Sequence, residues 1–501
     1  MSSRVPIRHG QLPRVLLACA VALAFAGCSI PARLGHPAIR DDVPLAGLDA
    51  GHRAGWPDAE WWRQYNDPQL DSLIALAMKG SPDIEQARSR VASAQQSIRA
   101  ATAQAGLSVN GSAQVQRQRL SENGLIPPKF LGFTWYNQGD IGAQAQYDFD
   151  WWGKKRATIE SAVDQAHAAE AQHSAAALAI QSTVADTYFG WLADEARTGI
   201  AQQGVQTQEQ LLRMAELRVR QGVDRPDTVQ SAKAQLAATR QMLVALQSSA
   251  KIRQAALASL VGVAPAQLPP LQPRALPDVT GGLPDNVGVD LMARRADIAA
   301  SRWQVEAALR QTDVARAEFY PDISISAMAG LSSIDLDKMF NAGNRVFALT
   351  PALHLPIFTG GLLEANYGVS KAQLDAAVAQ YNSTVLGAAR DVATQGLTAQ
   401  QLEGRRKEQA SEIAANQALL ANAQSRVRRG VSDQRETLAA KGQLLQQQDD
   451  ELSLHAQALS TDISLIKALG GGYRAVTPEQ AASDTSSSAS NLSGDAAHER
   501  H

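Results

Sequence analysis

The sequence predicts a mostly α-helical chain with a membrane β-barrel portion, arranged as two tandem repeats of helix–strand–strand–long helix–helix. Three observations predict this class: two very long stretches without proline, four stretches in which apolar and polar residues alternate, and short motifs that recur in the same order in both halves. Proline-free stretches favour helices, alternation favours strands, and ordered recurrence indicates a duplicated unit.

The composition excludes several classes of protein. The 501 residues are 45% hydrophobic and 19% charged, with a formal net charge of −2, so no basic field exists to hold nucleic acid. Two cysteines exclude a disulfide scaffold and a cysteine-rich zinc module. Because no phosphate loop, zinc-ligand spacing or nucleophile elbow occurs, we expect no enzymatic activity, no cofactor and no metal site.

The first 27 residues have the pattern of an export signal. A start with three arginines and no acidic residue precedes the apolar stretch Val15–Ala26, which predicts a secretory signal at residues 1–27. The small residues directly before Cys28 resemble a bacterial lipobox, so we expect Cys28 to be acylated and to anchor the chain in lipid. Ordinary signal cleavage, which would leave Cys28 as a free thiol, is the alternative.

Internal repeats divide the body of the chain. Arg218–Val223 recurs as Arg426–Val431, Leu260–Gly262 as Ala468–Gly470, and Ser81–Ile84 as Arg295–Ile298. Agreement in order and spacing indicates one structural unit that occurs twice. The predicted division is a signal at 1–27, a lipidated segment at 28–60, a first repeat at 61–262, a connector rich in Pro and Gly at 263–290, a second repeat at 291–472 and a disordered tail at 473–501.

Four segments alternate with period two, at about 107–120, 135–151, 322–332 and 345–356. One face of each is apolar or small. The opposite face is mostly Ser, Gln and Asp in the first three segments and less polar in the fourth, which has Val346, Ala348, Thr350 and His354 there. Such alternation is typical of a strand between lipid and water. Aromatic residues gather at the strand ends, where amphipathic rings favour a membrane interface: Trp135, Tyr136, Trp151 and Trp152. A soluble β-sandwich with these aromatics in its core is the alternative.

Membrane strands would force the chain to oligomerise. Every backbone polar group inside lipid must be paired, so only a closed barrel is allowed. Four strands cannot close, since the smallest bacterial barrels have about eight. Two copies would give eight strands around a filled interior, whereas three copies would give twelve strands and room for a pore.

Long helices are predicted at about 154–221, 227–261, 361–429 and 433–469. The first and third each span on the order of 100 Å. In the third, apolar residues recur at coiled-coil spacing: Leu374, Val378, Tyr381, Val385, Ala388 and Val392. Small, neutral residues on several other faces suit a helix packed on both flanks and wetted on its inner side, although an isolated coiled-coil rod would also fit. Both long helices end in Gly-Val, a turn where Gly adopts the left-handed conformation.

Several motifs in sequence order resemble one known family. They are Asp67–Leu70, Ser81–Ile84, Arg316–Ser324 and Leu355–Gly361. From about Trp61 to Gly472 the chain resembles the TolC-like outer-membrane efflux factor family, in its NodT-type outer-membrane lipoprotein branch. The resemblance implies a homotrimer with a twelve-stranded outer-membrane β-barrel, four strands per chain, continuous with a long periplasmic α-helical barrel. It also implies a periplasmic adaptor (membrane fusion) protein and an inner-membrane pump as partners.

The same resemblance assigns site residues. The helix tips that family members present to the adaptor fall at Gly222, Val223, Gly430 and Val431. Family members often place Asp directly after the second Gly-Val, whereas Ser432 stands there in this chain. Asp224 and Asp433 are therefore our candidates for the periplasmic gate. Their alternative role is to cap the N-termini of the returning helices.

The sequence thus predicts a passive exit duct of a tripartite efflux or secretion system. Drugs or other small molecules would pass from the pump and adaptor through the outer membrane, and the energy would come from the pump. A lipid-anchored periplasmic scaffold without a pore is the competing interpretation, and a cell-wall hydrolase is a weaker one. Asp148 and Asp150 suit acid/base chemistry, but carboxylates lining a pore explain them more simply. The sequence does not identify the cargo.

Overall fold

The computed structural model describes residues 35–43, 55–123, 127–279, 282–284 and 287–475. The predicted signal, Cys28 and residues 476–501 of the predicted tail lie outside these ranges. Contacts divide the chain into two compact units. Unit 1 takes its described residues from Met1–Ala38, Ala92–Ala168 and Arg302–Gln380, and unit 2 from Ile39–Val91, Ala169–Ser301 and Tyr381–His501. Each unit therefore combines segments from both halves of the sequence.

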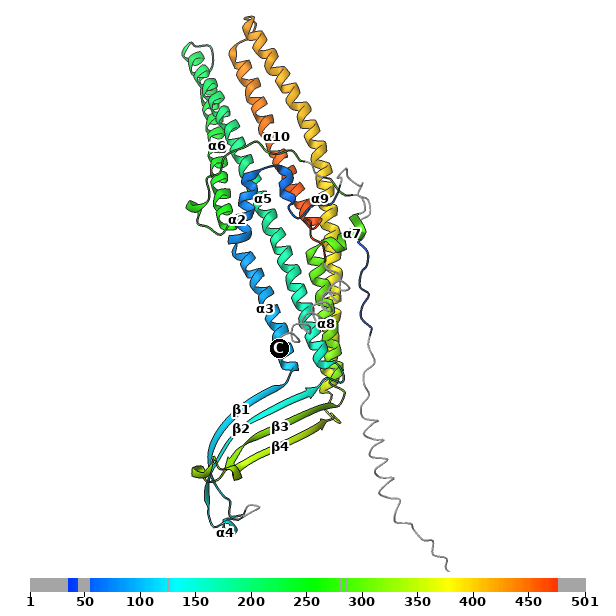
Figure 1. Cartoon of the computed structure of the whole chain (residues 1–501). Helices are drawn as coiled ribbons and strands as arrows, with labels where there is room; N and C mark the ends of the chain where they lie inside the picture. The colour runs from blue at the N-terminus through cyan, green and yellow to red at the C-terminus, as the bar shows by residue number, and fades with distance from the viewer. Residues whose placement is uncertain (1–34, 44–54, 124–126, 280–281, 285–286, 476–501) are drawn as a thin grey trace, which may run out of the picture. The chain divides into compact units, whose positions relative to one another are not determined.

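Unit 1 contains a four-stranded antiparallel sheet (Figure 1). Its strands are β1 (Ser108–Arg119), β2 (Trp135–Phe149), β3 (Asp322–Ser333) and β4 (Arg345–His354), and they pair in chain order. A short helix, α4 (Pro128–Leu131), lies in the β1–β2 connection, and the 3-10 turns η3 (Leu336–Lys338) and η4 (Ala342–Asn344) lie in the β3–β4 connection.

The strand register places residues of like polarity on the same face. Val109 pairs with Ala145, Ala145 with Ala327, and Ala327 with Leu349, so this row crosses all four strands on one face. The neighbouring row on the opposite face contains Ser108, Gln146, Ser326 and Thr350. The side-chain period of two repeats this difference along most of the sheet, although Met328, Val346 and Ala348 also lie on the face of Gln146. The sheet is therefore amphipathic, with one apolar and one polar face.

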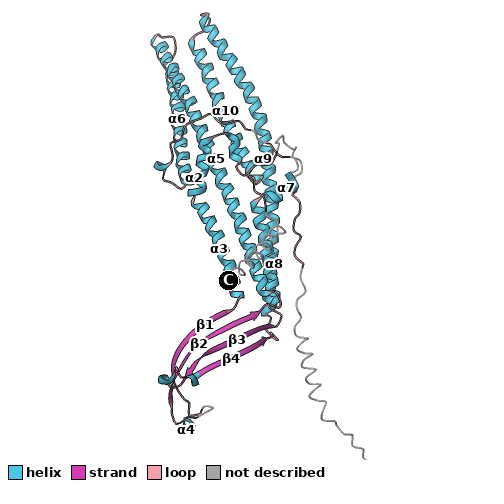
Figure 2. Cartoon of the chain, in the orientation of Figure 1, coloured by secondary structure: helices cyan, strands magenta, loops and turns pink. Residues whose placement is uncertain are grey.

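The rest of the described chain is mostly helical (Figure 2). The helices are α2 (Pro68–Gly80), α3 (Pro82–Ala105), α5 (Lys154–Arg220), α6 (Pro226–Leu260), α7 (Val287–Arg294), α8 (Ala296–Ala317), α9 (Leu362–Arg428) and α10 (Gln434–Ala468), with 3-10 turns η1 (Trp61–Tyr65) and η2 (Pro265–Gln267). The predicted class, helices with a small antiparallel sheet, is confirmed. Within the described residues, no helix combines the length and apolar character needed to cross a membrane.

Corresponding helices in the two halves have equal lengths. Helices α5 and α9 each have 67 residues, and α6 and α10 each have 35. The six apolar residues that recur at coiled-coil spacing in α9 are all buried. Helix α7 begins at Val287, inside the segment 263–290 that was predicted as connector. Its one glycine, Gly288, lies in the first turn, where few hydrogen bonds within the helix depend on it.

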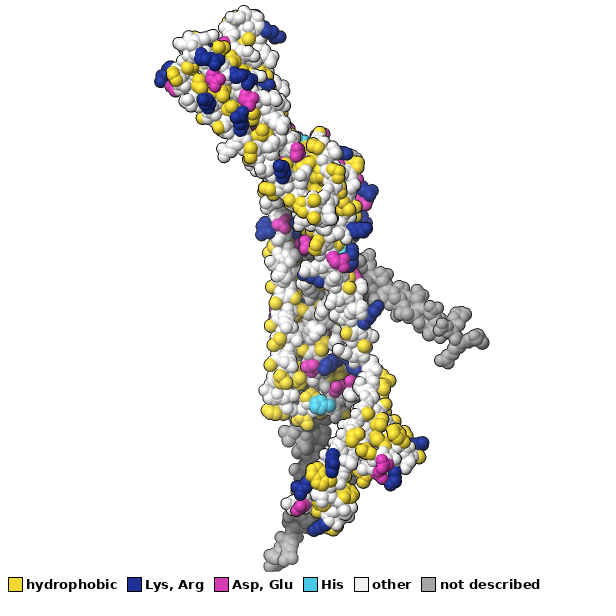
Figure 3. Space-filling model, turned by 90° about the vertical axis from the view of Figure 1, so that its left-hand side faces the viewer, with side chains coloured by type: hydrophobic (Ala, Val, Ile, Leu, Met, Phe, Trp, Pro, Cys, Tyr) yellow, Lys and Arg dark blue, Asp and Glu magenta, His cyan; other side chains and the backbone are white. Residues whose placement is uncertain are grey.

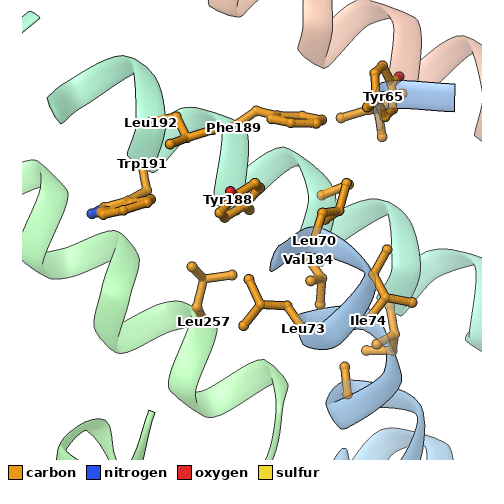
Figure 4. Packing of buried hydrophobic residues seen from close by; sticks show 14 of the residues in the cluster. Tyr65, Leu70, Leu73, Ile74, Val184, Tyr188, Phe189, Trp191, Leu192 and Leu257 are labelled. Atoms are coloured by element: carbon orange, nitrogen blue, oxygen red, sulfur yellow. The ribbon is translucent and has the colours of Figure 1, made fainter. Parts of the chain in front are cut away.

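The core of unit 2 forms where α2, α5, α6 and α10 meet (Figure 4). Leu73, Tyr188, Trp191 and Leu257 are at most 2% exposed. A hydrogen bond 2.7 Å long from the Tyr188 hydroxyl to Asp67 Oδ2 ties α5 to the residue that caps α2. Burial and the adjacent Asp67 carboxylate raise the pKa of Tyr188, so the phenol remains a proton donor.

The segment between the two halves is bound to this core. The Gln272 amide donates to Gln69 Oε1 at 2.9 Å, and Arg274 pairs with Asp67 at 3.6 Å. Farther along, the carbonyl oxygen of Pro277 lies 2.9 Å from Nε2 of His455 on α10. These contacts fix the path of a segment that has little helix or strand of its own.

We predict that Gly262→Ala destabilises unit 2 by at least about 2 kcal/mol. Gly262 has φ +76°, and a Cβ there would lie 2.0 Å from the carbonyl oxygen of Gly80. The matched control is Gly199→Ala within α5, where a Cβ meets nothing within 4 Å. The control should gain about 0.5–1 kcal/mol, because Ala is the better helix former. Thermal unfolding of the detergent-solubilised variants measures both changes, and equal melting temperatures would contradict the prediction.

Candidate functional site

The first candidate feature is the pair of turns that end α5 and α9. Gly222 (φ +69°) and Gly430 (φ +74°) take the left-handed conformation. The amide of Val223 donates to the Arg218 carbonyl at 2.9 Å, as that of Val431 does to the Arg426 carbonyl at 3.0 Å. These are equivalent Schellman-type caps. Val223 is 58% exposed and Val431 72%, so each turn presents an apolar side chain to its surroundings.

Four charged residues link the two turns. Arg218 makes a bidentate pair with Asp224, at 2.7 and 3.0 Å, and its third nitrogen lies 3.7 Å from Asp433. Arg435 contacts Asp224 at 3.2 Å and Asp433 at 2.8 Å. Because each arginine contacts both carboxylates, the network joins the α5–α6 hairpin to the α9–α10 hairpin. We call these four residues the tip network. Figure 3 shows basic and acidic side chains gathered at this end of the helices.

The two candidate gate carboxylates have different local roles. Asp433 is the N-cap of α10 and accepts a hydrogen bond from the Arg435 amide, which matches the alternative role predicted for it. Asp224 caps no helix, because the N-cap of α6 is Arg225. Its bonds from Arg218 hold the pKa of Asp224 below its ordinary value, against some desolvation. Partial desolvation opposes the effect at Asp433, but the Arg435 amide and guanidinium still lower its pKa.

Sequence reasoning missed the two arginines of the tip network. Arg218 belongs to the recurring segment Arg218–Val223, and its counterpart Arg426 also finds a carboxylate, Glu436 on α10. The recurrence was therefore a usable signal for a paired arginine before each turn. Ser432, which occupies the place of the expected Asp, has a buried hydroxyl oxygen without a hydrogen-bond partner.

The second candidate feature is the sheet itself. The strand order β1-β2-β3-β4 leaves β1 and β4 each paired along one side only within the described residues. Asp140 on the polar face accepts hydrogen bonds from Ser332 at 2.6 Å and Gln114 at 3.1 Å, so polar side chains connect neighbouring strands there. The opposite face exposes large apolar side chains, which include Val109, Phe347, Leu349 and Leu353.

The predicted interface aromatics lie at both ends of β2. Trp135 and Tyr136 begin the strand, and the Tyr136 hydroxyl donates to Gln118 at 2.9 Å. Trp151 and Trp152 follow its last residue and are 68% and 49% exposed. Exposed indoles at both ends of an amphipathic strand are typical of the two boundaries of a membrane.

Comparison with known proteins agrees with this geometry. The profile of the family described as outer membrane efflux protein matches residues 73–263 and 287–471. The chain is 32% identical to the multidrug resistance outer membrane protein MdtP of Escherichia coli O6:H1, over 93% of this chain and 98% of that protein. The fold and these relatives define an efflux channel protein of the outer membrane. The chain belongs to the outer membrane efflux protein family, and the predicted family is confirmed.

Solved structures show the same fold. The outer membrane protein VceC of Vibrio cholerae superposes with a TM-score of 0.75 at 33% identity, covering 84% of this chain and all of that one. The CmeC outer membrane channel of Campylobacter jejuni gives a TM-score of 0.80, covering 91% of this chain and 98% of that one. At 19% identity, the second comparison concerns the fold alone.

We predict that the tip network persists from neutral to mildly acidic pH and weakens progressively once the pH falls below about 3.8, the ordinary pKa of an aspartate side chain. Contacts with Arg218 and Arg435 lower the pKa values of Asp224 and Asp433 from the ordinary carboxyl value in the folded chain. When a carboxyl pKa is lowered by folding, the carboxylate stabilises the fold at pH values above its ordinary pKa. This contribution disappears as the pH falls through the pKa of the folded state. Hydrogen exchange at the Val223 and Val431 amides, corrected for the intrinsic rate, should therefore be equal at pH 8 and 5.5 and should accelerate at pH 3.

The matched control for this measurement is Asp227→Asn. Asp227 pairs only with Arg225, at 3.0 Å on the same hairpin, among the contacts that the structure gives it. Its replacement should leave the exchange profile unchanged, whereas Asp224→Asn should produce the fast exchange already at pH 7. Slow exchange in Asp224→Asn at neutral pH would contradict a role for the network in holding the turns.

Proposed function

We propose that three copies of this chain form the passive exit duct of a tripartite efflux system. The observation that carries the proposal is the amphipathic sheet with one open edge on β1 and another on β4. In a membrane these edges need partners, because unpaired backbone groups in lipid cost several kcal/mol each. Pairing β4 of one copy with β1 of the next satisfies both edges with the same contact.

Chain geometry favours three copies over two. Two copies would close eight strands, whose interior is just filled by side chains. Three copies would close twelve strands and leave an aqueous interior. The polar face, with Asp140, Gln114 and Ser332, would line that interior, and the apolar face, with Val109 and Leu349, would contact lipid.

The partners and cargo follow from the tips and from the relatives. The exposed turns at Gly222-Val223 and Gly430-Val431 offer close backbone approach and an apolar knob to a periplasmic adaptor protein. An inner-membrane pump would supply the energy through that adaptor. MdtP is named a multidrug resistance protein, so we propose small-molecule drugs as cargo. We also propose that acylated Cys28 adds a lipid anchor to the barrel.

The tip network is our proposed gate. It ties the two hairpins of one copy together, and an iris-like opening would need them to separate. An adaptor would open the duct by binding the separated arrangement more tightly than the tied one, which shifts the equilibrium between them. The network is partly exposed, so salt screens it and a modest difference in affinity suffices.

We expect the purified protein to run as a trimer and to produce stepwise ion conductance in planar lipid bilayers. A scaffold without a pore would bind the bilayer through its lipid anchor and give no steps. The scaffold interpretation is therefore favoured if a well-folded trimer, inserted at high protein concentration, leaves the bilayer current at its baseline.

We predict that Asp224→Asn and Arg435→Ala increase the conductance of the closed duct, because each removes contacts that bridge the hairpins. High salt should produce the same change in the unmodified protein by screening. Arg225→Ala is the matched control, since Arg225 lies at the same tip but, among the described residues, its side chain pairs only with Asp227 of its own hairpin. Unchanged conductance in both network variants, or an equal increase in the control, would assign the gate elsewhere.

A further inference from the structure

We propose that a pocket in unit 1, at the junction of β2 with α5 and of α8 with β3, binds the phosphate group of a membrane phospholipid. The cavity has a volume of about 470 Å³. It is lined by three arginines, Arg156, Arg310 and Arg316, together with Trp151, Trp152 and Tyr320. The inference rests on the proposed function, which places the strands in the membrane.

Among the residues that line the pocket, Arg316 carries the main argument for a bound anion. It opens the segment Arg316–Ser324, yet its side chain makes no ion pair or hydrogen bond with the described residues, and its Nε is buried. A guanidinium whose Nε is buried without a hydrogen-bond partner is unfavourable, since a lost hydrogen bond of a charged group costs on the order of 1–3 kcal/mol. A phosphate oxygen in the cavity would satisfy these donors, and arginine is well suited to bind phosphate through two parallel bonds.

The other charges of the pocket leave room for one anion. Glu160 lies 3.4 Å from Arg310 and 4.0 Å from Arg156, and Asp313 also lines the cavity. Three arginines against two carboxylates give a net charge of about +1, which one phosphodiester would neutralise. Asp164 lies 3.9 Å from Arg310 Nε. Burial raises the pKa of Asp164 to about 6, so this carboxylate competes weakly for Arg310 in mildly acidic surroundings.

The aromatic and apolar neighbours favour a lipid over free phosphate. Trp152 stacks on Tyr320 with ring centroids 4.5 Å apart, and Trp151 beside them is 68% exposed. At the same end of the sheet, the turn after β4 exposes Ile357 by 63% and Phe358 by 90%. Phe149, the last residue of β2, pairs with Ile323 of β3, which in turn pairs with Leu353 near the end of β4. The end of β2 and the end of β4 therefore lie at the same end of the sheet. Indoles beside arginines at a membrane boundary suit a headgroup with acyl chains attached, whereas inorganic phosphate would leave the apolar surface exposed.

The test titrates the detergent-purified trimer with dioctanoyl phosphatidylglycerol and counts bound lipid by native mass spectrometry. Two further arms use dioctanoylglycerol, which lacks the phosphate, and inorganic phosphate, which lacks the chains. We expect saturable binding of the phospholipid alone. Arg316→Ala should weaken it at least about tenfold, as expected for one charge-assisted contact. Arg316→Lys should recover part of the affinity, and Trp151→Ala should weaken lipid binding through the acyl-chain side.

The matched control is Arg302→Ala, on the same helix α8 but outside the pocket, where Arg302 pairs with Glu306 at 3.2 Å. It should bind lipid as the unmodified protein does. Equal lipid affinity in Arg316→Ala, or equal binding of dioctanoylglycerol, would overturn the phosphate site. Binding of inorganic phosphate as tightly as of lipid would overturn the lipid assignment.

Conductance separates this proposal from the proposed function. Arg316→Ala trimers should still conduct ions, because Arg316 belongs neither to the polar sheet face nor to the tip network. A conducting protein that binds no phospholipid overturns the pocket assignment alone. An unmodified protein that binds phospholipid but never conducts overturns the duct and leaves a lipid-bound subunit of another kind.

Discussion

The pairing of backbone hydrogen bonds in the sheet is the constraint on which the rest of this molecule depends. Three strand pairings leave one side of β1 and one side of β4 open in the described chain. In water such edges can be solvated, but in lipid they must be paired, so the proposed place of the sheet in the membrane would require several copies of the chain to assemble. The amphipathic register supports the same proposal, because in a closed barrel the apolar face contacts only lipid and the polar face only water. Membership of the outer membrane efflux protein family places the protein at the outer membrane.

The long helices are stabilised differently from the sheet, by the packing of small residues and by capped turns. Helices α5 and α9 are rich in Ala and Gln, so their stability depends on packing along several faces rather than on one apolar stripe. The large apolar side chains concentrate where α2, α5, α6 and α10 meet. Among the described residues no comparable cluster of large apolar side chains is found at the tips, where charge pairs such as Arg218–Asp224 connect the turn to its helix. Charge pairs respond to salt and to partner proteins more readily than buried apolar contacts do, which suits a region that is proposed to move.

Much of the fold could be predicted because its signals are local. Proline-free stretches mark α5 and α9, alternation marks the four strands, and the Gly-Val motif marks both turns. The site was less predictable, because a charge pair depends on distance in space and not on spacing along the chain. Asp224 and Asp433 stood out by their position after a turn, but Arg435 became visible only when the two hairpins were seen together. The lack of a partner for Nε of Arg316 among the described residues was equally unpredictable, since it depends on what surrounds the side chain in space.

The sequence by itself determined the class of fold, the family and the position of the turns, because periodicity and composition act within one helix or strand. Only the tertiary structure decided the row from Val109 to Leu349, the bridging of two hairpins by Arg218 and Arg435, and the meeting of Trp151 with Arg316 at one cavity. The physical reason is the range of the interactions. Helix and strand preferences act over a few neighbouring residues, whereas register, ion pairs and pockets join residues that lie hundreds of positions apart.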